Sequence, residues 1–413
     1  MRILVRVLGT AVLAFVVFSL GIPRVASGAN PSFEVRCDKG ETVGAALDKG
    51  QPGAPLTLII SGACNENVSI ARDDVTLMAT PGSATINGPD PTVATINVVG
   101  NRVLIDGLTV TGGRNGITAV AGKTTVQNCT VSNAVSTGIV FRQADGRVDH
   151  CVVQNNGLIG ISIEAGFAII VSSTISANGQ DGILLTRVGV ARIGLLTGPI
   201  AYAGNIISNN GTNGIHVAGN SAAAIGGNTI SGNGFGFGFL GGNNGINAGA
   251  GAFLDIVGAN TVTGNAGTGI FGGDVSTVSI GDTTWGLTNI TNTITSNGGG
   301  GVSVVSGSSL RIRAATISNN TGDGVNIVLR SVGMLTSTSI DTVTVSNNTG
   351  NGIVLNLGGS LLLNQPFGGP FVGVTGNHLV GLQCFGGDAR FAGNTAGISG
   401  NADDVDTINC QPL

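Results

Sequence analysis

The sequence predicts an all-β solenoid in which short parallel strands stack coil upon coil. Three segments, Thr130–Phe141, Val152–Ile163 and Thr174–Leu185, repeat one pattern, and their isoleucine anchors at 139, 161 and 183 are 22 residues apart. Apolar residues recur at every second position around each anchor, which is the period of a strand rather than a helix. One such unit cannot bury its own apolar side, so successive units must stack at a strand spacing of about 4.8 Å.

Composition indicates a folded repeat protein with many tight turns. Glycine accounts for 71 of 413 residues, charged residues for 10% and aromatic residues for 4%, and the net charge is −4. Glycine and asparagine tolerate positive φ, so their recurrence at fixed offsets indicates turns. The low charge is not that of a disordered chain, and without a basic stripe there is no reason to expect nucleic acid as a partner.

Residues 1–29 have the pattern of a secretory signal peptide. Arg2 and Arg6 accompany an apolar segment, Val7–Leu20, whose 14 residues are fewer than the roughly 20 that span a membrane. Small residues follow at Val25–Ala29. We expect a secreted, periplasmic or cell-surface protein with no membrane span in the mature chain. An uncleaved N-terminal anchor is the alternative.

Residues 30–100 are expected to form an N-terminal cap and the first coils. Glu41–Lys49 has the pattern of a short amphipathic helix, with Ala45, Ala46 and Leu47 toward the core. Short apolar segments separated by Gly, Pro, Asn and Asp follow it and predict strands. A solenoid needs such a cap because the open strand edges of its first coil would pair with other chains.

Residues 101–413 are expected to form the β-helix repeats and a C-terminal cap. An apolar anchor, often preceded by glycine, marks about 12 coils. These anchors are Ile117, Ile139, Ile161, Ile183, Ile215, Ile246, Ile270, Val302, Val325, Ile353, Leu382 and Ile398. In most coils a second anchor stands eight residues earlier.

Asparagine recurs at two fixed offsets from the second anchor. Three residues after it, nine successive coils have Asn156, Asn178, Asn210, Asn233, Asn265, Asn297, Asn320, Asn348 and Asn377. Two residues before it, a shorter series has Asn205, Asn228, Asn260 and Asn292. We interpret both series as structural ladders in which stacked amides bond to one another and to turn backbone.

Six cysteines in an exported chain predict disulfides. They are Cys37, Cys64, Cys129, Cys151, Cys384 and Cys410. The first two flank the start of the mature chain and the last two remain for its C-terminal end. Cys129 and Cys151 are one repeat apart, which places them one above the other at a separation that permits a disulfide. A buried pair of thiols is the alternative for these two residues.

Together, the 22-residue coils, the asparagine ladders and the capping helix resemble right-handed parallel β-helix proteins of the pectin-lyase-like superfamily. The resemblance covers nearly all of the mature chain. It implies a single-stranded right-handed parallel β-helix with a short N-terminal capping helix. It says little about function, because lyases, hydrolases, epimerases, esterases and adhesins share this fold.

The resemblance also implies where a site would lie, namely on the outer face of the strand after the glycine–isoleucine anchor. There Arg142, Glu164 and Thr186 occupy equivalent positions in successive coils, and Arg187 follows Thr186. Arginine neutralises the carboxylate of a uronic acid and a base removes its α-proton, so this strip is a candidate catalytic site. The alternative is a solvated row of ion pairs that contributes little stability.

Three further residues complete the candidate set. Asp149 and His150, in the turn before the second anchor, are added to the catalytic candidates, and His216 joins Thr186 as a binding candidate. His216 has no acidic neighbour in sequence, and ordinary surface is the alternative interpretation of it.

No catalytic signature of the superfamily is present. The chain lacks Gly-His-Gly, the paired aspartates that follow Asn-Thr-Asp, and Arg-Ile-Lys. Asp403, Asp404 and Asp406 form the densest acidic group, where Ca²⁺ is one interpretation and a polar C-terminal cap is the other. We therefore predict no cofactor and no dedicated metal site.

Long loops follow the anchor strand at four places: Arg187–Ala203, Gly273–Asn289, Arg330–Thr342 and Leu357–Val372. They carry apolar residues, which either pack together as a flap or form a surface for self-association. These residues are Leu195, Leu196, Tyr202, Trp285, Met334, Leu361–Leu363, Phe367 and Phe371. Three functions remain open. The first is non-catalytic binding of polysaccharide or envelope glycan, the second is a polysaccharide lyase or related uronate enzyme, and the third is a structural or self-associating surface protein.

Overall fold

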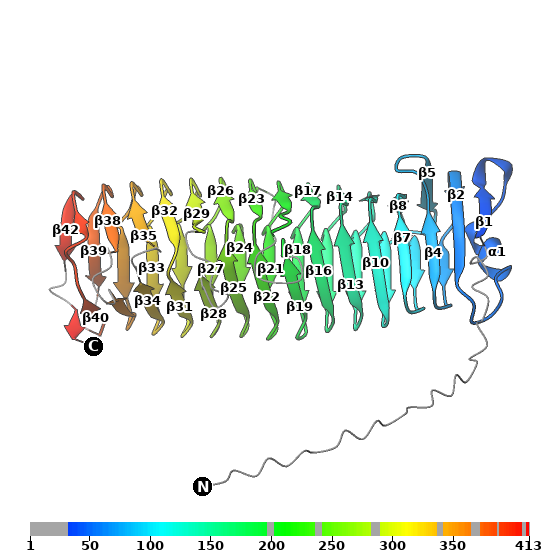
Figure 1. The fold of residues 1–413 in the computed structure, drawn as a ribbon. Helices are drawn as coiled ribbons and strands as arrows, with labels where there is room; N and C mark the ends of the chain where they lie inside the picture. Colours follow the sequence, from blue (N-terminus) through cyan, green and yellow to red (C-terminus); the bar gives the residue numbers. More distant parts are fainter. Residues whose placement is uncertain are drawn as a thin grey trace, which may run out of the picture.

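The chain winds into one elongated solenoid, with the capping helix at one end and the C-terminal strands at the other (Figure 1). The computed structural model describes residues 32–195, 202–235, 242–281, 290–336, 342–364, 372–385, 388–406 and 410–412. The candidate signal peptide at 1–29 lies outside these residues. Strands of successive coils pair in parallel, which confirms the predicted all-β parallel β-helix.

Each complete coil contributes three short strands, one to each of three series. The first series is a 14-stranded sheet that contains eleven of the twelve predicted anchors. Its strands are β3 (Val68–Ile70), β6 (Ile96–Val98), β9 (Ile117–Val120), β12 (Ile139–Arg142), β15 (Ile161–Glu164), β18 (Ile183–Thr186), β21 (Ile215–Val217), β24 (Ile246–Ala248), β27 (Ile270–Gly272), β30 (Val302–Val304), β33 (Val325–Val328), β36 (Ile353–Asn356), β39 (Val380–Phe385) and β42 (Asp403–Asp406). The three strands without a predicted anchor are β3, β6 and β42.

The other two series form a continuous 29-stranded sheet because β2 belongs to both. The second series is β1 (Ser32–Arg36), β2 (Leu56–Asn65), β4 (Val75–Met78), β7 (Val103–Asp106), β10 (Lys123–Gln127), β13 (Asp145–Asp149), β16 (Phe167–Val171), β19 (Val190–Ile193), β22 (Ala222–Gly226), β25 (Phe253–Gly258), β28 (Thr277–Ile280), β31 (Ser309–Ile312), β34 (Val332–Thr336), β37 (Ser360–Asn364), β40 (Arg390–Gly393) and β43 (Gln411–Pro412). The third series is β5 (Ala84–Gly88), β8 (Thr109–Gly112), β11 (Thr130–Ser132), β14 (Val152–Gln154), β17 (Thr174–Ser176), β20 (Ile206–Ser208), β23 (Thr229–Ser231), β26 (Thr261–Thr263), β29 (Asn292–Thr295), β32 (Ala315–Ser318), β35 (Val343–Ser346), β38 (Gly373–Thr375) and β41 (Ile398–Ser399).

The core is filled from all three series. In the coil of β12 to β14, Ile139, Phe141, Val148 and Val153 are fully buried. We did not predict the second series from the repeats and expected Asp149 to lie in a turn. Asp149 is instead the last residue of strand β13. Glycine at 146 explains why this strand escapes prediction, since this inward position must stay small: a Cβ there would lie 2.6 Å from the Phe141 ring. Without a large anchor the strand has no obvious apolar signature.

The long asparagine ladder is confirmed and runs further than predicted. Each ladder amide donates from Nδ2 to Oδ1 of the next, from Asn156 to Asn178 at 2.9 Å and onward to Asn377, and Asn401 is a further rung. Each Oδ1 also accepts the backbone N–H of the preceding rung, as Asn178 does from Asn156 at 3.2 Å. The shorter series is likewise bonded, with Asn205 donating to Asn228 at 2.9 Å.

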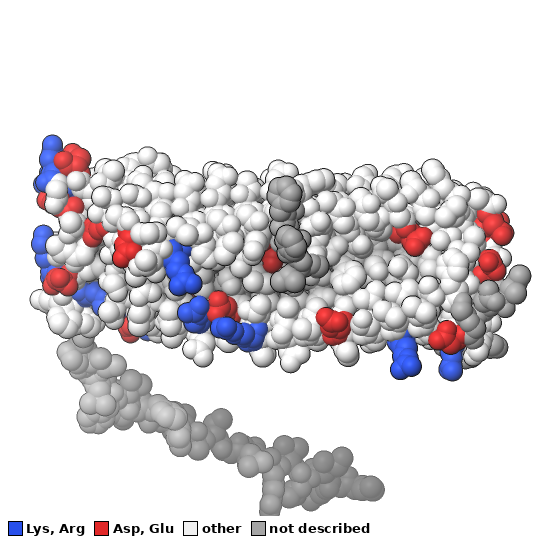
Figure 2. Space-filling model, turned by 180° about the vertical axis from the view of Figure 1, so that it is seen from behind, with Lys and Arg blue, Asp and Glu red and all other residues white. Residues whose placement is uncertain are grey.

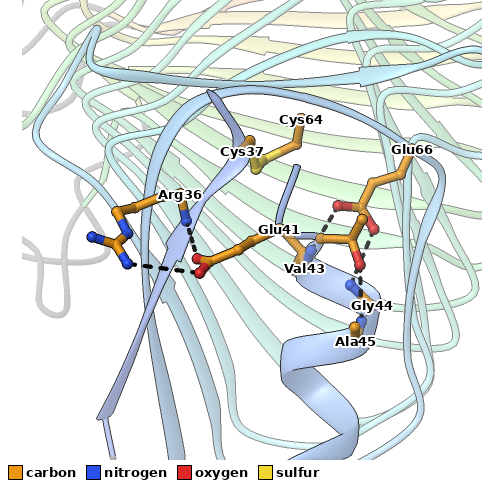
Figure 3. The surroundings of a disulfide bond; sticks show 9 residues. Arg36, Cys37, Glu41, Val43, Gly44, Ala45, Cys64 and Glu66 are labelled. Carbon is orange, nitrogen blue, oxygen red and sulfur yellow. Dashed lines mark hydrogen bonds and ion pairs between the residues drawn. A yellow bond between two sulfur atoms is a disulfide. The ribbon is translucent and has the colours of Figure 1, made fainter. Parts of the chain in front are cut away.

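The capping helix is shorter than predicted and starts later. It is α1 (Val43–Asp48), preceded by a single 3₁₀ turn, Cys37–Lys39. Val43, Ala46 and Leu47 are buried, whereas Ala45, expected toward the core, is exposed. Glu66, from the first coil, accepts the N–H groups of Val43 at 2.6 Å and Gly44 at 3.0 Å, beside the Cys37–Cys64 disulfide (Figure 3). A carboxylate at a helix N-terminus satisfies otherwise unpaired donors and complements the helix dipole.

Disulfides link Cys37 to Cys64 and Cys384 to Cys410, one near each end of the solenoid. The expected bond between Cys129 and Cys151 is wrong: both are free and buried. The two residues do stack, but they occupy the ladder column that Ser173 and Asn205 continue. Their thiols donate to Gln127 O at 3.0 Å and Asp149 O at 3.3 Å, and the pair matches the buried thiols of the alternative interpretation.

Two further expectations are corrected. Ile398, taken as an anchor of the first series, lies in β41 and pairs with Val374 of the third series. The four long loops each begin with a strand of the second series, β19, β28, β34 or β37, so the insertions follow that strand instead of the anchor strand. Leu361 and Leu363, expected in a covering flap, are buried in the solenoid core. Trp285, Leu196, Phe367 and Phe371 lie outside the described residues.

Within the part of the chain that the structure describes, no helix has the length and apolarity needed to cross a membrane.

Candidate functional site

The outer face of the 14-stranded sheet carries a polar groove of about 650 Å³ over β3 to β15. Each anchor side chain points inward, so the residue after it points outward, and strand pairing stacks these outward residues in a column. The loop before β6 forms one wall, where Asn67 donates to Ala94 O at 3.0 Å and accepts Asp90 N–H at 3.1 Å. The groove is lined by amides, hydroxyls and charged groups that include Asn97, Asn115, Thr118, Arg114, Arg142 and Glu164.

The predicted Arg142–Glu164–Arg187 strip exists as a closed ion-pair network. Strand pairing aligns Arg142 with Glu164 and Glu164 with Thr186. Glu164 Oε2 accepts from Arg142 Nε at 3.1 Å and from Arg187 Nη1 at 3.0 Å. Arg142 and Arg187 remain 49% and 73% exposed, whereas Glu164 is 18% exposed. The strip can present guanidinium groups to an anion, but its carboxylate is already occupied.

Asp149 and His150 lie apart from this strip, at the end of β13 in the other sheet. Asp149 accepts from Arg147 Nη2 at 2.6 Å and lies 2.6 Å from His150 Nδ1. Arg142 ends β12, whereas Asp149 is at the far end of the next strand, β13. Because a strand advances about 3.3 Å per residue, the length of β13 keeps Asp149 and His150 away from Arg142. The structure therefore divides the five catalytic candidates into two separate clusters.

His216 does have an acidic partner, which the sequence did not reveal. Its Nδ1 lies 3.1 Å from Oδ2 of Asp181, a residue 35 positions earlier that is nearly fully buried. Asp181 Oδ1 accepts from Thr212 Oγ1 at 2.6 Å, Asn213 N at 3.0 Å and Asn213 Nδ2 at 2.9 Å. Burial alone would raise the pKa of Asp181, but hydrogen bonds from His216, Thr212 and Asn213 outweigh it and hold that pKa below its ordinary value.

Asp181 belongs to a third ladder. In each coil, the residue of this ladder precedes the anchor of the first strand series by two positions. Asn213 Oδ1 accepts Asn244 N–H at 3.1 Å, and Asn244 Oδ1 accepts Thr268 N–H at 3.0 Å, so the column continues through four coils. A signal for it was present in the sequence, because Asp181, Asn213 and Asn244 each stand two residues before an anchor isoleucine. That constant offset places Asp181 in the column, but it does not show that the carboxylate meets His216 of the next coil.

Comparison with known proteins identifies the family. A model described as "Right handed beta helix region" matches residues 60–193, 94–259 and 168–331, which together span more than half of the chain. The chain belongs to the right-handed β-helix family. None of the curated proteins compared with it matches.

This β-helix is similar to several solved structures at low identity. A tailspike protein, Dettilon gp208, has a TM-score of 0.50 and 13% identity, with 83% of this chain and 64% of the tailspike covered. The A-module of Azotobacter vinelandii mannuronan C-5 epimerase AlgE4 has a TM-score of 0.46 and 16% identity, with 85% and 95% covered. Pectate lyase Pel9A has a TM-score of 0.41 and 14% identity, with 75% and 76% covered. At these identities the likeness concerns the fold.

The described residues of this β-helix offer no convincing metal centre. The one group of three His, Cys, Asp or Glu residues with ligand atoms within 4.8 Å of one another is Cys37, Cys64 and Glu66, and its two sulfurs form a disulfide. Asp403, Asp404 and Asp406, where Ca²⁺ was considered, do not converge as a set of three, because Asp403 lies on the opposite face of β42 from Asp404 and Asp406. Asp404 instead ends the long ladder by accepting Asn401 N–H at 3.0 Å.

Proposed function

We propose that this protein is an exported, non-catalytic β-helix that binds an acidic polysaccharide in the groove over β3 to β15. The observation that carries the proposal is Arg114, an exposed guanidinium in the groove that has no ion-pair partner among the described residues. Guanidinium matches a carboxylate in a planar, bidentate fashion, which suits a uronate group.

The remaining lining of the groove supports a glycan rather than an apolar ligand. Amide and hydroxyl groups from Asn97, Asn115 and Thr118 lie along its floor, and Arg142 adds a second cation at the end where Glu164 lies. Such groups form the hydrogen bonds that sugar hydroxyls require. Charged side chains are otherwise sparse on this molecule, as the face in Figure 2 illustrates, so a cation in a groove is an uncommon feature of its surface.

The lyase alternative is less well supported. A base must reach the substrate proton directly, whereas Glu164 is only 18% exposed and lies between two guanidinium groups that hydrogen-bond to it. Asp149 and His150 lie in the other sheet and do not join it. Incubation with pectate and alginate, followed by ultraviolet absorbance of unsaturated uronate products, distinguishes binding from cleavage. We expect no absorbing product, and product formation would replace the binding proposal.

The test of binding compares two variants that remove one positive charge each. Arg114→Gln changes the groove, and Lys123→Gln removes an exposed cation on β10, outside the groove lining. Titration calorimetry with pectate, alginate and neutral dextran should show binding of one or both acidic polymers but not dextran. Arg114→Gln should bind about tenfold more weakly because a charge-assisted pair is lost. The proposal would be contradicted if the two variants bound the acidic polymers with equal affinity, or if the protein bound neither pectate nor alginate.

A further inference from the structure

We propose that the pocket beside β21, β24 and β27 is a separate site that binds one neutral, hydroxylated sugar ring through His216, Asn247 and Phe271. The three side chains follow the anchors of successive coils, and strand pairing aligns His216 with Asn247 and Asn247 with Phe271. They therefore stand on one outer face, about one strand spacing apart. This extends the proposed glycan binding to a second place on the same sheet, but its test does not depend on the groove.

The pocket has the size and walls for a single ring. Its volume is about 230 Å³, below the roughly 300 Å³ at which pockets for larger organic ligands begin. Phe271 offers an apolar wall, and Gly273 leaves that wall open, since a Cβ there would lie 3.0 Å from Phe271 Cε1. A sugar ring has a C–H face for such an aromatic surface and hydroxyls around its edge.

Asn247 supplies an acceptor that the protein itself does not satisfy. The residue is only 6% exposed, and its Oδ1 is buried without a hydrogen-bond partner among the described residues. Leaving such an atom unpaired costs free energy, and native structures retain the few examples for a reason. A ligand hydroxyl would provide the missing donor once the amide turns toward the pocket that Asn247 lines.

His216 supplies a second polar group in a fixed orientation. Its Nδ1 is engaged by the Asp181 carboxylate, which three further hydrogen bonds hold in place. An ionised carboxylate accepts only, so Nδ1 carries a proton, and Nε2 is left for a ligand hydroxyl, which can both donate and accept. The imidazole is 28% exposed and lines the pocket, and no described residue bonds to Nε2.

Charge selects a neutral ring over an acidic one. Among the described residues no Lys or Arg lines the pocket, while Asp274 does, and the Asp181 carboxylate engages His216. A sugar carboxylate would meet the negative charge of Asp274 without a guanidinium or ammonium group to offset it. The groove over β3 to β15, with Arg114, has the opposite preference.

The experiment uses the fact that the chain has three histidines. The imidazole signals of the full chain are followed by ¹H–¹³C NMR, with His216→Gln assigning the signal of interest. Methyl glucoside, methyl galactoside and methyl rhamnoside are titrated, and galacturonate is the acidic comparison. One or more neutral glycosides should shift the His216 signal in a saturable way and leave His150 and His378 unmoved. Asn247→Ala and Phe271→Ala should weaken binding about fivefold to tenfold, and Arg114→Gln should not change it.

A stability measurement separates a binding role for Asn247 from a structural one. Because its Oδ1 is unpaired, Asn247→Ala should leave the thermal midpoint unchanged or raise it, whereas a structural amide would lower it. A lowered midpoint, no His216 shift with any neutral glycoside, an equal or larger shift with galacturonate, or unchanged affinity in both variants would each overturn the proposal. Loss of polyuronate binding with an intact His216 response would refute the groove alone.

Discussion

Asp181 shows how one residue can serve both the scaffold and the surface. Its Oδ1 accepts from Asn213, as an asparagine rung would, and its Oδ2 remains for His216. Asparagine at the same place would offer only one carbonyl oxygen for both tasks. The carboxylate is therefore the side chain that keeps the ladder bonded while fixing the tautomer of an imidazole on the outer face.

Acid should reveal the contribution of Asp181. Its pKa in the folded protein is lowered, so its stabilising effect is complete above the ordinary aspartate pKa of about 3.9 and is lost as pH falls through the folded value. We expect the unfolding free energy of the wild type, relative to Asp181→Asn, to decline as pH falls below about 4. Urea unfolding between acid and neutral pH measures this, with the exposed Asp274→Asn as control. A pH-independent difference would contradict the assignment.

At the scale of the element, the ladders explain how short strands of different coils keep their register. Each rung bonds to the next side chain and to backbone, so a shift of one coil would break several bonds at once. The sequence alone predicted two of these columns because asparagine recurs at a constant offset from an apolar anchor. It missed the second strand series because the inward residue near the start of these strands is small: Gly146, Ala168, Ala191 and Ala223.

Removing one rung from the middle of the long ladder should be costly. Asn233 accepts from Asn210 N and Nδ2 at 3.1 and 3.0 Å and donates to Asn265 and Ile207. Asn233→Ala leaves two buried donors of Asn210 unsatisfied, which should lower the unfolding free energy by about 3 kcal/mol. Urea unfolding monitored by circular dichroism checks this against Gln180→Ala, an exposed residue in a nearby turn. Similar midpoints for both variants would show that the ladder is not stabilising.

At the scale of the whole molecule, exposed strand edges and apolar surface determine whether the solenoid associates with other copies of itself. The helix contacts β2 and β3 beside a disulfide, so it shields part of the first coil from pairing with other chains. Val190, Phe253 and Val332 are exposed along one face, but Ala222, Thr277 and Ser309 stand between them in the same column. Their apolar surface is interrupted rather than continuous.

We therefore expect a monomer, contrary to the self-associating alternative. Multi-angle light scattering of the chain across a hundredfold range of concentration should give one constant mass. Phe253→Ser should behave as the wild type, because no interface depends on it. A mass that rises with concentration and falls again in Phe253→Ser would instead favour a self-associating surface protein.

The sequence by itself determined the winding of the chain, its apolar lining and its two main amide columns. These follow from a local period, because the same side chains recur at the same offsets in every coil. It also brought Arg142, Glu164 and Arg187 together correctly, since those coils are of nearly equal length.

Only the tertiary structure decided which polar groups meet where the coils differ in length. From Ile183 to Ile215 the spacing grows from 22 to 32 residues, so Asp181 and His216 are neighbours at a separation that the regular repeat does not predict. The state of the central cysteines was equally inaccessible: Cys129 and Cys151 are free and buried, although their spacing permits a disulfide. The period fixes where each backbone lies, whereas the bonds between coils depend on insertions and on the direction in which each side chain turns.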